Sequence, residues 1–449
     1  MKNRTIIISD LHLGGGEKDP GDDHVYQNGA LARFIAAVTD SADGRNGEVE
    51  LFINGDFLEF AQANQDAYRS PSRDYWCSES ESVEKLNFIL SGHSATFSAL
   101  GALMRLGNAV TIAAGNHDVD LWWDSVQQIL RYATYDTLKF ETGVEWVERY
   151  EGRLQISHGH MKDPANTFKH WANPVKTGPH GTRLEMCAGT LFMVNFVNGL
   201  EAEYPFADNL LPVQNLATLL WRGDRAGFRT AAWALLKIAM SHPVAMAESD
   251  SDDYGRAMHH RVHDDDAFAL RLFRAALYRN AETAVDVDGL RQQVRSQASL
   301  AKFILDHWRL LDEAGLNTEL AGSSRPTLGP SASTKSLGKI VAGGAFGKEA
   351  LRRIATDRVA TAPTTQVVVM GHTHVSDDVQ LMHSVRYLNP GSWTRYIDLE
   401  KHPEITLNDL KDESKFPYSL KYVQVTGGVQ SGLHASLETF DDMRMCRFA

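Results

Sequence analysis

The sequence predicts an α/β fold in which polar ligand residues lie at the ends of sheet strands. Two observations lead to this prediction. The first part of the chain alternates strand-like and helix-like segments, and five strand-like segments each end in a short run of Asp, His, Asn and Gly. Alternation of this kind is typical of α/β sheets, which bind ligands at the carboxyl ends of their strands.

The elements are predicted in chain order from hydrophobic periodicity and from the turn residues that bound each run. Up to residue 157 they are a strand at 5–9, a helix near 28–39, a strand at 50–54, a helix at 81–106, a strand at 109–113, a helix at 120–131 and strands at 144–150 and 153–157. Glu151-Gly152 between the last two strands predicts a tight hairpin. Strands near the end of the chain, at 366–370, 379–382, 385–389, 420–425 and 435–440, are expected to complete a second sheet.

Between the fourth and fifth polar runs the chain changes character. Residues 163–363 are rich in Ala, Leu, Phe, Trp and Arg, and apolar residues recur at helical spacing in 229–241, 268–278 and 300–311. A segment this long exceeds ordinary loop lengths, so we predict a mainly helical insertion that forms a cap. The predicted domains are therefore a core in two parts, 1–162 and 364–449, and an insertion at 163–363.

The five polar runs carry metal-ligand chemistry. They are Ser9-Asp10-Leu11-His12, Gly55-Asp56, Gly115-Asn116-His117-Asp118, Ser157-His158-Gly159-His160 and Gly371-His372-Thr373-His374. A single Asp or His beside a glycine is usually an ordinary turn residue, but here five such runs each follow a strand-like stretch. Two divalent ions can neutralise phosphoryl oxygens and activate water, and oxygen and imidazole ligands of this kind can hold them. Together the runs predict a two-metal hydrolytic site.

The order of these runs resembles the calcineurin-like metallophosphoesterase superfamily, whose pattern reads D-x-H, G-D, G-N-H-[DE], H and G-H-x-H. The nearest wording is that of UDP-diacylglucosamine pyrophosphohydrolase-type members, which also begin S-D-L-H-L and carry an N-x-G-[ST]-W strand ending, seen here at 389–393. The resemblance covers residues 1–162 and 366–396. It implies a double β-sheet sandwich flanked by helices, and the long insertion departs from that compact family.

The resemblance also implies roles for individual residues. The implied metal ligands are Asp10, His12 and His374 for a first ion, Asn116, His158 and His372 for a second, and Asp56 as the carboxylate that bridges both. His117 would contact the phosphoryl group or protonate the leaving oxygen, and Asp118 would orient its imidazole. Two positions stay open: Glu59 either orients a ligand or is a solvated glutamate, and His160 either supports the site or lies on the surface.

Mixed oxygen and imidazole ligands without a thiolate are compatible with Mn²⁺, Fe and Zn²⁺, and the number of histidines disfavours Mg²⁺. We expect two divalent ions, with Mn²⁺ favoured. The expected reaction is hydrolysis of a phosphodiester, a pyrophosphate or a nucleotide-linked phosphoester by metal-activated water. The substrate would be a small phosphoester or nucleotide-type molecule, and the sequence does not name it.

Two alternatives remain at this point. A DNA or RNA nuclease of the same superfamily is suggested because its exonuclease members share the opening D-x-H-L-G found at 10–14. A formal net charge of −12 and the lack of a basic run longer than a pair disfavour nucleic acid as a partner, since its phosphates are bound by clustered Lys and Arg. A catalytically silent metal-binding scaffold is the other alternative, although such proteins usually lack the histidine found here as His117.

Composition supplies the remaining expectations. The chain has 449 residues and 43% hydrophobic content, which is typical of globular proteins. No apolar run reaches the roughly 18 residues that a membrane-spanning helix needs. The first residues enter a strand directly, without the apolar region of a signal peptide, so we expect a cytoplasmic protein without a transmembrane segment.

Overall fold

The computed structural model describes two compact units, one formed by Met1–Leu211 with Phe346–Ala449 and the other by Pro212–Ala345. The described residues are 2–16, 29–63, 77–163, 165–178, 181–187, 189–190, 193–201, 203–211, 347–399, 401–427 and 432–442, with scattered residues between 216 and 303. The first unit contains every residue for which we predict a site role. It also contains residues 163–211 and 346–363, which the sequence analysis assigns to the insertion, so the functional boundaries at 162 and 363 stay a prediction.

The first sheet has six strands in the order β15-β14-β1-β2-β3-β4. Their bounds are β1 (Arg4–Ile8), β2 (Val49–Asn54), β3 (Ala109–Ala113), β4 (Lys139–Glu141), β14 (Lys421–Thr426) and β15 (His434–Thr439). Strands β1 to β4 pair in parallel, β14 pairs antiparallel with β1, and β15 pairs antiparallel with β14. The carboxyl ends of the four parallel strands therefore lie at one edge of the sheet.

The second sheet has five strands in the order β11-β12-β10-β6-β5. Their bounds are β5 (Val147–Arg149), β6 (Leu154–Ser157), β10 (Val367–Met370), β11 (Asp377–Gln380) and β12 (Arg386–Asn389). Strand β10 is parallel to both β6 and β12, and the edge strands β5 and β11 run antiparallel to their neighbours. The ends of β6 and β10, where two polar runs begin, are thus neighbours.

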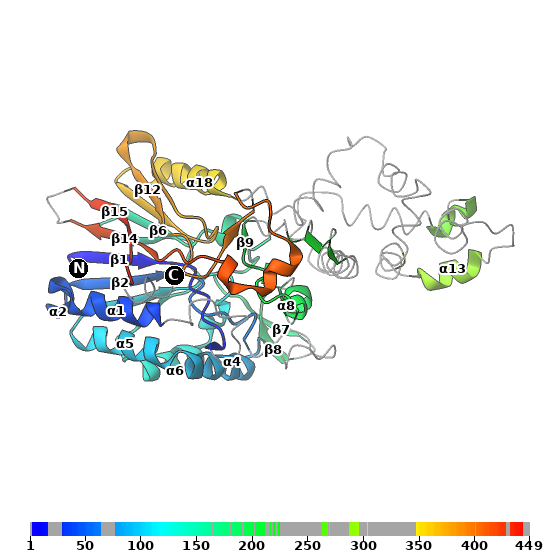
Figure 1. Cartoon of the computed structure of the whole chain (residues 1–449), viewed down its shortest axis with the longest axis horizontal. Coiled ribbons are helices and arrows are strands. Elements are labelled where there is room, and N and C mark those ends of the chain that lie inside the picture. The colour runs from blue at the N-terminus through cyan, green and yellow to red at the C-terminus, as the bar shows by residue number, and fades with distance from the viewer. Residues whose placement is uncertain are drawn as a thin grey trace. The chain divides into compact units, whose positions relative to one another are not determined.

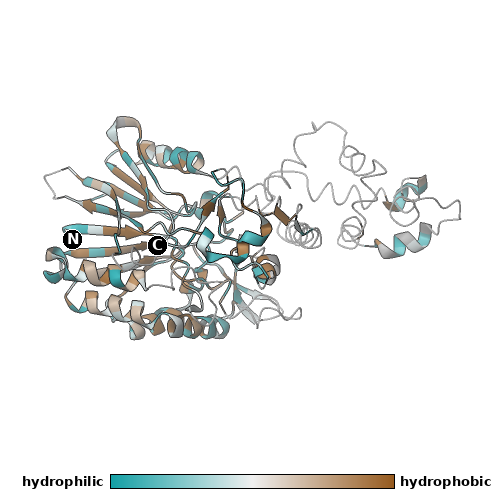
Figure 2. Cartoon of the chain, in the orientation of Figure 1, coloured by the Kyte–Doolittle hydropathy of each residue, from teal (hydrophilic) through white to brown (hydrophobic). Residues whose placement is uncertain are grey.

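Hydrophobic residues of both sheets form one buried core. Ile7 and Phe52 of the first sheet belong to the same cluster as Ile156 and Val369 of the second. Figure 1 shows α1 and α5 alongside the first sheet and α18 alongside the second, and Figure 2 shows hydrophobic residues along the strands. Burial on both faces explains why residues 6–8 of β1, residues 51–53 of β2 and the whole of β10 are continuous apolar runs instead of alternating ones.

The helices complete the unit. The α-helices are α1 (Ala30–Asp40), α2 (Ala42–Arg45), α4 (Glu79–Gly92), α5 (Ser94–Arg105), α6 (Asp124–Ala133), α8 (Asn198–Glu201) and α18 (Lys348–Thr361), with α13 (Val287–Gln293) in the other unit. Shorter turns are η3 (Val119–Trp122), η4 (His160–Lys162), η6 (Met382–Ser384), η7 (Leu407–Lys411), η8 (Glu413–Lys415) and the π-helix η5 (Met193–Val197). Helix α18 covers the second sheet by packing Leu351 and Ala355 against Val368 and Tyr387.

The predicted α/β class is confirmed, with differences in detail. The single helix predicted at 81–106 is two helices, because it breaks at His93 between α4 and α5. The last two predicted strands, now β14 and β15, were expected in the second sheet but extend the first, since β14 pairs with β1. The hairpin predicted at Glu151-Gly152 joins β5 and β6, and both residues have positive φ.

The predicted insertion is not wholly helical where it is described. A hairpin of β7 (Val175–Gly178) and β8 (Gly181–Leu184) lies within it, and β9 (Leu210–Leu211) pairs with β13 (Ile397–Asp398). The helix predicted at 229–241 lies outside the described residues, as do most of 268–278 and 300–311. Among the residues that the structure describes, no helix is long and apolar enough to cross a membrane.

Candidate metal centre

The structure brings most of the predicted ligands together where the strands end. The donor atoms form two groups, and within each group all atoms lie within 4.8 Å of one another. The first group comes from Asp10, His12, Asp56 and His374, and the second from Asp56, His158 and His372. Their residues follow β1, β2, β6 and β10, whose ends meet because the strands are parallel within each sheet and the sheets share a core. Asp56 belongs to both groups, which is the position expected of a bridging carboxylate.

The first group packs its nitrogens and oxygens closely. His12 Nε2 lies 3.1 Å from His374 Nε2, and His374 Nε2 lies 3.3 Å from Asp10 Oδ1. Two imidazole nitrogens at this distance can share only one proton. A cation between them and the carboxylate would satisfy all three atoms, and Asp10 is fully buried, so the donor set fits a divalent ion.

In the second group, backbone contacts select the tautomer of one histidine. His158 Nδ1 lies 2.8 Å from the carbonyl oxygen of Asn54 and donates to it, while its Nε2 lies 3.0 Å from Asp56 Oδ2. A proton held on Nδ1 leaves Nε2 with a lone pair for a metal. Asn116 Oδ1 is buried and has no hydrogen-bond partner among the described residues, so this oxygen is available to the same ion.

The backbone of the ligand loops is strained. The φ angles are positive at five predicted ligands: Asp10 (56°), His12 (45°), Asp56 (49°), His372 (69°) and His374 (58°). Non-glycine residues rarely adopt this region, and such conformations persist only where the surroundings enforce them. Gly55, with φ of 80°, has no room for a Cβ because the His158 ring packs against it. The packing around these loops therefore restricts the positions of the ligand side chains.

Residues 389–393, at the end of β12, form hydrogen bonds with the backbone of two of these loops. Ser392 Oγ donates to the carbonyl oxygen of Asp10 at 2.6 Å, and Asn389 Nδ2 donates to the carbonyl oxygen of Gly371 at 3.1 Å. Trp393 is fully buried, and its backbone NH donates to the same Asp10 oxygen at 3.3 Å. The N-x-G-S-W ending therefore positions the first and last ligand runs. In the sequence this ending indicated only the family resemblance and not this role.

Glu59 is buried between two histidines. Its Oε2 lies 2.7 Å from His12 Nδ1 and 2.7 Å from His117 Nδ1, and the side chain is fully inaccessible. Burial alone would raise the pKa of Glu59, but the charge of His117 and the hydrogen bonds from both rings lower it to about 2. The solvated reading of Glu59 is therefore wrong, and its carboxylate orients both imidazoles.

The same contact corrects the orienting role expected of Asp118. Asp118 Oδ1 accepts the backbone NH of Gly115 at 2.5 Å, and its Oδ2 accepts that of Phe57 at 2.8 Å, so it holds two ligand loops together. Burial and the charge of Asp56 raise the pKa of Asp118 to about 7. For His117, burial lowers the pKa, but the charges of Glu59 and Asp56 outweigh it and raise that pKa to about 10. His117 thus carries a proton at neutral pH.

Burial and neighbouring charges also have opposite effects on the pKa values within the ligand groups. Burial would raise the pKa of Asp56, but the charges of His158 and His117 hold it well below its ordinary value. Burial would lower the pKa of His158, but the charge and hydrogen bond of Asp56 raise it to about 9. Without a metal, protons on His158 and His117 compensate the buried carboxylates, and a divalent ion bound to His158 would replace its proton.

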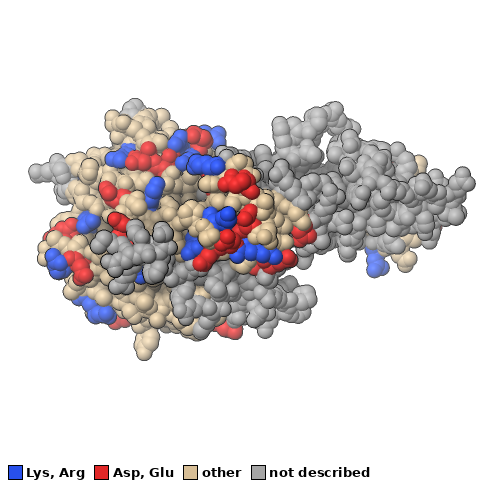
Figure 3. Space-filling view, viewed as in Figure 1, with Lys and Arg blue, Asp and Glu red and all other residues tan. Residues whose placement is uncertain are grey.

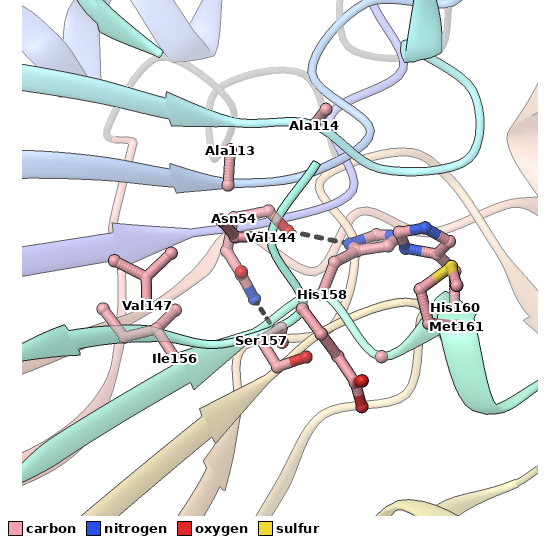
Figure 4. Close-up of a pocket in the computed structure, with 12 residues that line it drawn as sticks. Asn54, Ala113, Ala114, Val144, Val147, Ile156, Ser157, His158, His160 and Met161 are labelled. Atoms are coloured by element: carbon pink, nitrogen blue, oxygen red, sulfur yellow. Dashed lines mark hydrogen bonds between the residues drawn. The ribbon is translucent and has the colours of Figure 1, made fainter. Parts of the chain in front are cut away.

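His160 is buried and lines a pocket beside His158. Figure 4 shows both rings at the pocket with Asn54, whose carbonyl group accepts from His158. The His160 ring lies edge-on to Trp171 at 4.5 Å, and neither of its nitrogens has a hydrogen-bond partner among the described residues. Burial is the first cause that keeps the His160 pKa well below its ordinary value. The surface reading of His160 is therefore wrong.

The sequence analysis missed Asp163 and Asn166, which touch two predicted ligands. Asp163 Oδ2 lies 3.0 Å from His372 Nε2, and Asn166 Oδ1 accepts Asn116 Nδ2 at 3.3 Å. Only their place shortly after the fourth polar run could have pointed to them.

No protein-family model matches this chain, and no curated protein matches it. What the centre does is therefore inferred from its own chemistry: buried His, Asp and Glu groups that could hold metal ions.

Proposed function

We propose that this protein is a binuclear metal-dependent phosphohydrolase that cleaves a phosphodiester, a pyrophosphate or a nucleotide-linked phosphoester. The observation that carries the proposal is the position of Asp56, which belongs to both ligand groups while the other members of each group are different residues. A shared carboxylate is what a pair of adjacent ions requires. The orphaned Asn116 oxygen and the five strained ligand residues support the same reading.

Bound there, two divalent ions would supply positive charge to phosphoryl oxygens and make water acidic enough to act as a nucleophile near neutral pH. Asp10, His12 and His374 would hold one ion, and Asn116, His158 and His372 the other. His117 would donate its proton to a phosphoryl or leaving-group oxygen, because the Glu59 carboxylate beside its Nδ1 favours the protonated ring. Glu59 would fix the direction in which the His117 ring points.

A nuclease is the weaker alternative. Nucleic-acid binding needs clustered cations, and the chain has a net charge of −12. On the face seen in Figure 3, the Lys and Arg residues of the described part are interspersed with Asp and Glu. Cleavage of oligonucleotides with steep salt dependence would favour the nuclease over a small-molecule hydrolase.

The insertion is proposed as a cap that selects substrates. The predicted insertion at 163–363 starts soon after His158 in the sequence and ends shortly before His372, and these two histidines belong to one ligand group. The second unit, 212–345, lies within this insertion. Deletion of 212–345, the whole second unit, with a short Gly/Ser linker should leave metal binding and cleavage of a small aryl phosphoester intact. Preference among larger substrates should be lost, and an unchanged preference would remove the cap proposal.

The central test compares three variants of the Mn²⁺-loaded protein on an aryl phosphodiester and an aryl monoester. Asp56→Asn and His117→Ala should each lower kcat by about 10²-fold or more, because they remove the bridging charge and the proton donor. His402→Ala is the matched control, since His402 also pairs with a carboxylate, Glu404 at 3.2 Å, but is an exposed residue. Full activity of both site variants, with folding confirmed by circular dichroism, would contradict the proposal.

A further inference from the structure

One short segment after η4 contacts two predicted ligands of the second ion. Asp163 Oδ2 lies 3.0 Å from Nε2 of His372, and Asn166 Oδ1 accepts from Nδ2 of Asn116 at 3.3 Å. His372 and Asn116 come from different sheets, following β10 and β3. The segment therefore links the two halves of the site on the side of the second ion.

Each contact determines which atom of the ligand carries the lone pair that a metal could bind. A His372 ring that donates its Nε2 proton to a carboxylate leaves Nδ1 with a lone pair. An Asn116 amide that donates through Nδ2 turns Oδ1 to the opposite side, and this oxygen has no hydrogen-bond partner among the described residues. Metals bind the oxygen of an amide and not its nitrogen, so the Asn166 carbonyl selects the useful orientation.

The segment is itself held in place. Asp163 accepts the backbone NH of Ala165 at 3.0 Å and the side-chain amide of Asn166 at 2.8 Å, so the two positioning groups fix each other. The carbonyl oxygen of Ala165 accepts the NH of Gly189 at 2.7 Å. Thr190 Oγ1 in turn donates to the backbone carbonyl of Asn116 at 3.2 Å. These contacts connect the segment with the loop that follows β3 and carries Asn116.

We infer that Asp163 and Asn166 are positioning residues for the second ion, Asp163 by orienting His372 and Asn166 by orienting Asn116. The inference rests on the metal site of the proposed function, but not on its hydrolytic activity. Loss of either residue should therefore weaken the binding of the second ion and leave the binding of the first unchanged. Neither residue contacts the first ion's ligands Asp10, His12 or His374 in the described contacts.

Mn²⁺ binding to the whole chain tests this, with calorimetry for stoichiometry and affinity and electron paramagnetic resonance for the spin-coupled ion pair. Asp163→Ala and Asn166→Ala should each weaken the affinity for the second ion roughly 10- to 100-fold and leave the affinity for the first ion unchanged. The coupled signal should give way to that of isolated Mn²⁺ at the same loading. Asp163→Asn keeps an oxygen that can accept from His372, so it should retain more affinity than Asp163→Ala.

Glu185→Ala is the matched control. Glu185 is buried in the same stretch of chain and contacts a histidine that is no predicted ligand, with its Oε2 3.0 Å from His170 Nδ1. It should bind both ions like the unchanged protein. If Asp163→Ala does not fold, Asp163→Asn and Asn166→Ala decide. Two unweakened sites in the variants, equal weakening of both, or fewer than two ions in the unchanged protein would overturn the inference. Two ions bound without any hydrolysis would instead reject the proposed function alone.

Discussion

Replacement of Glu59 by glutamine perturbs the contact that joins a metal ligand to the proton donor. One carboxylate oxygen lies 2.7 Å from both His12 Nδ1 and His117 Nδ1. Glutamine preserves the size of the side chain but removes the charge. If its amide oxygen takes the place of Oε2, the NH₂ group faces the backbone NH of Ala61, which donates to Oε1 at 3.2 Å in the unchanged protein. If the amide is turned the other way, the NH₂ group faces both imidazoles as a donor, so neither arrangement keeps all three contacts.

The size of the effect follows from these two contacts. Loss of a partner that orients a metal-bound histidine typically costs about 10- to 100-fold in metal affinity, or roughly 1.4–2.8 kcal/mol. The first ion should be weakened by this amount, because His12 belongs to its ligand group. The pKa of His117, raised to about 10 chiefly by the charge of Glu59 against the effect of burial, should fall. Loss of an oriented proton donor lowers kcat by about 10²- to 10⁴-fold.

The assay combines Mn²⁺ titration calorimetry, kcat on an aryl phosphodiester at saturating metal, and the histidine titration followed by NMR. Glu50→Gln serves as the control, because Glu50 is a buried carboxylate on β2, the strand before Glu59, and pairs with Arg149 at 3.0 Å away from the ligand groups. An unchanged first affinity together with an unchanged kcat in Glu59→Gln would refute the orienting role. Equal losses in Glu50→Gln would show that the effect is general destabilisation.

Four further predictions concern stability and proton binding. Trp393→Ala should lower the free energy of unfolding by about 3–5 kcal/mol in urea denaturation, since the ring is fully buried; a loss under about 1 kcal/mol would contradict its anchoring role. Asp118→Ala leaves the buried amides of Gly115 and Phe57 without their acceptor, so it should destabilise the metal-free protein by roughly 1–3 kcal/mol per amide, which thermal unfolding can measure. The pKa of His158, lowered by burial but raised overall to about 9 by Asp56, exceeds its ordinary 6.5. Its contribution to stability should therefore be complete below about pH 6.5 and vanish as the pH rises through about 9 in the metal-free protein. Mn²⁺ binding at pH 7.5 should accordingly release protons, seen as a buffer-dependent heat in calorimetry; a buffer-independent heat would count against His158 as a ligand.

Much of the candidate site could be read from local sequence. Each ligand run directly follows a strand, and the ends of parallel strands in one sheet meet at one edge, so proximity of Asp10 and Asp56 was expected from local sequence. His158 follows a strand of the other sheet, and only the family resemblance implied that it joins them. The strands that precede the ligand runs were also predictable, because buried β-branched runs bounded by glycine and polar residues have few other solutions. Short strands such as β4, β7 and β8 were not predicted. The glycine at Gly55 marked a tight turn that the structure shows as a left-handed backbone packed against a ligand ring.

The partners of these ligands were decided only by tertiary structure. Asp163 and His372 are 209 residues apart, and no periodicity relates them. Glu59, not Asp118, contacts the His117 ring, because the loop after β2 turns its glutamate inward while backbone amides occupy Asp118. The placement of β14 beside β1 likewise depends on which sheet edge remains open after the parallel strands have paired. Local sequence specifies which residue types end a strand, whereas the hydrogen bonds that orient them depend on the packing of segments distant in the chain.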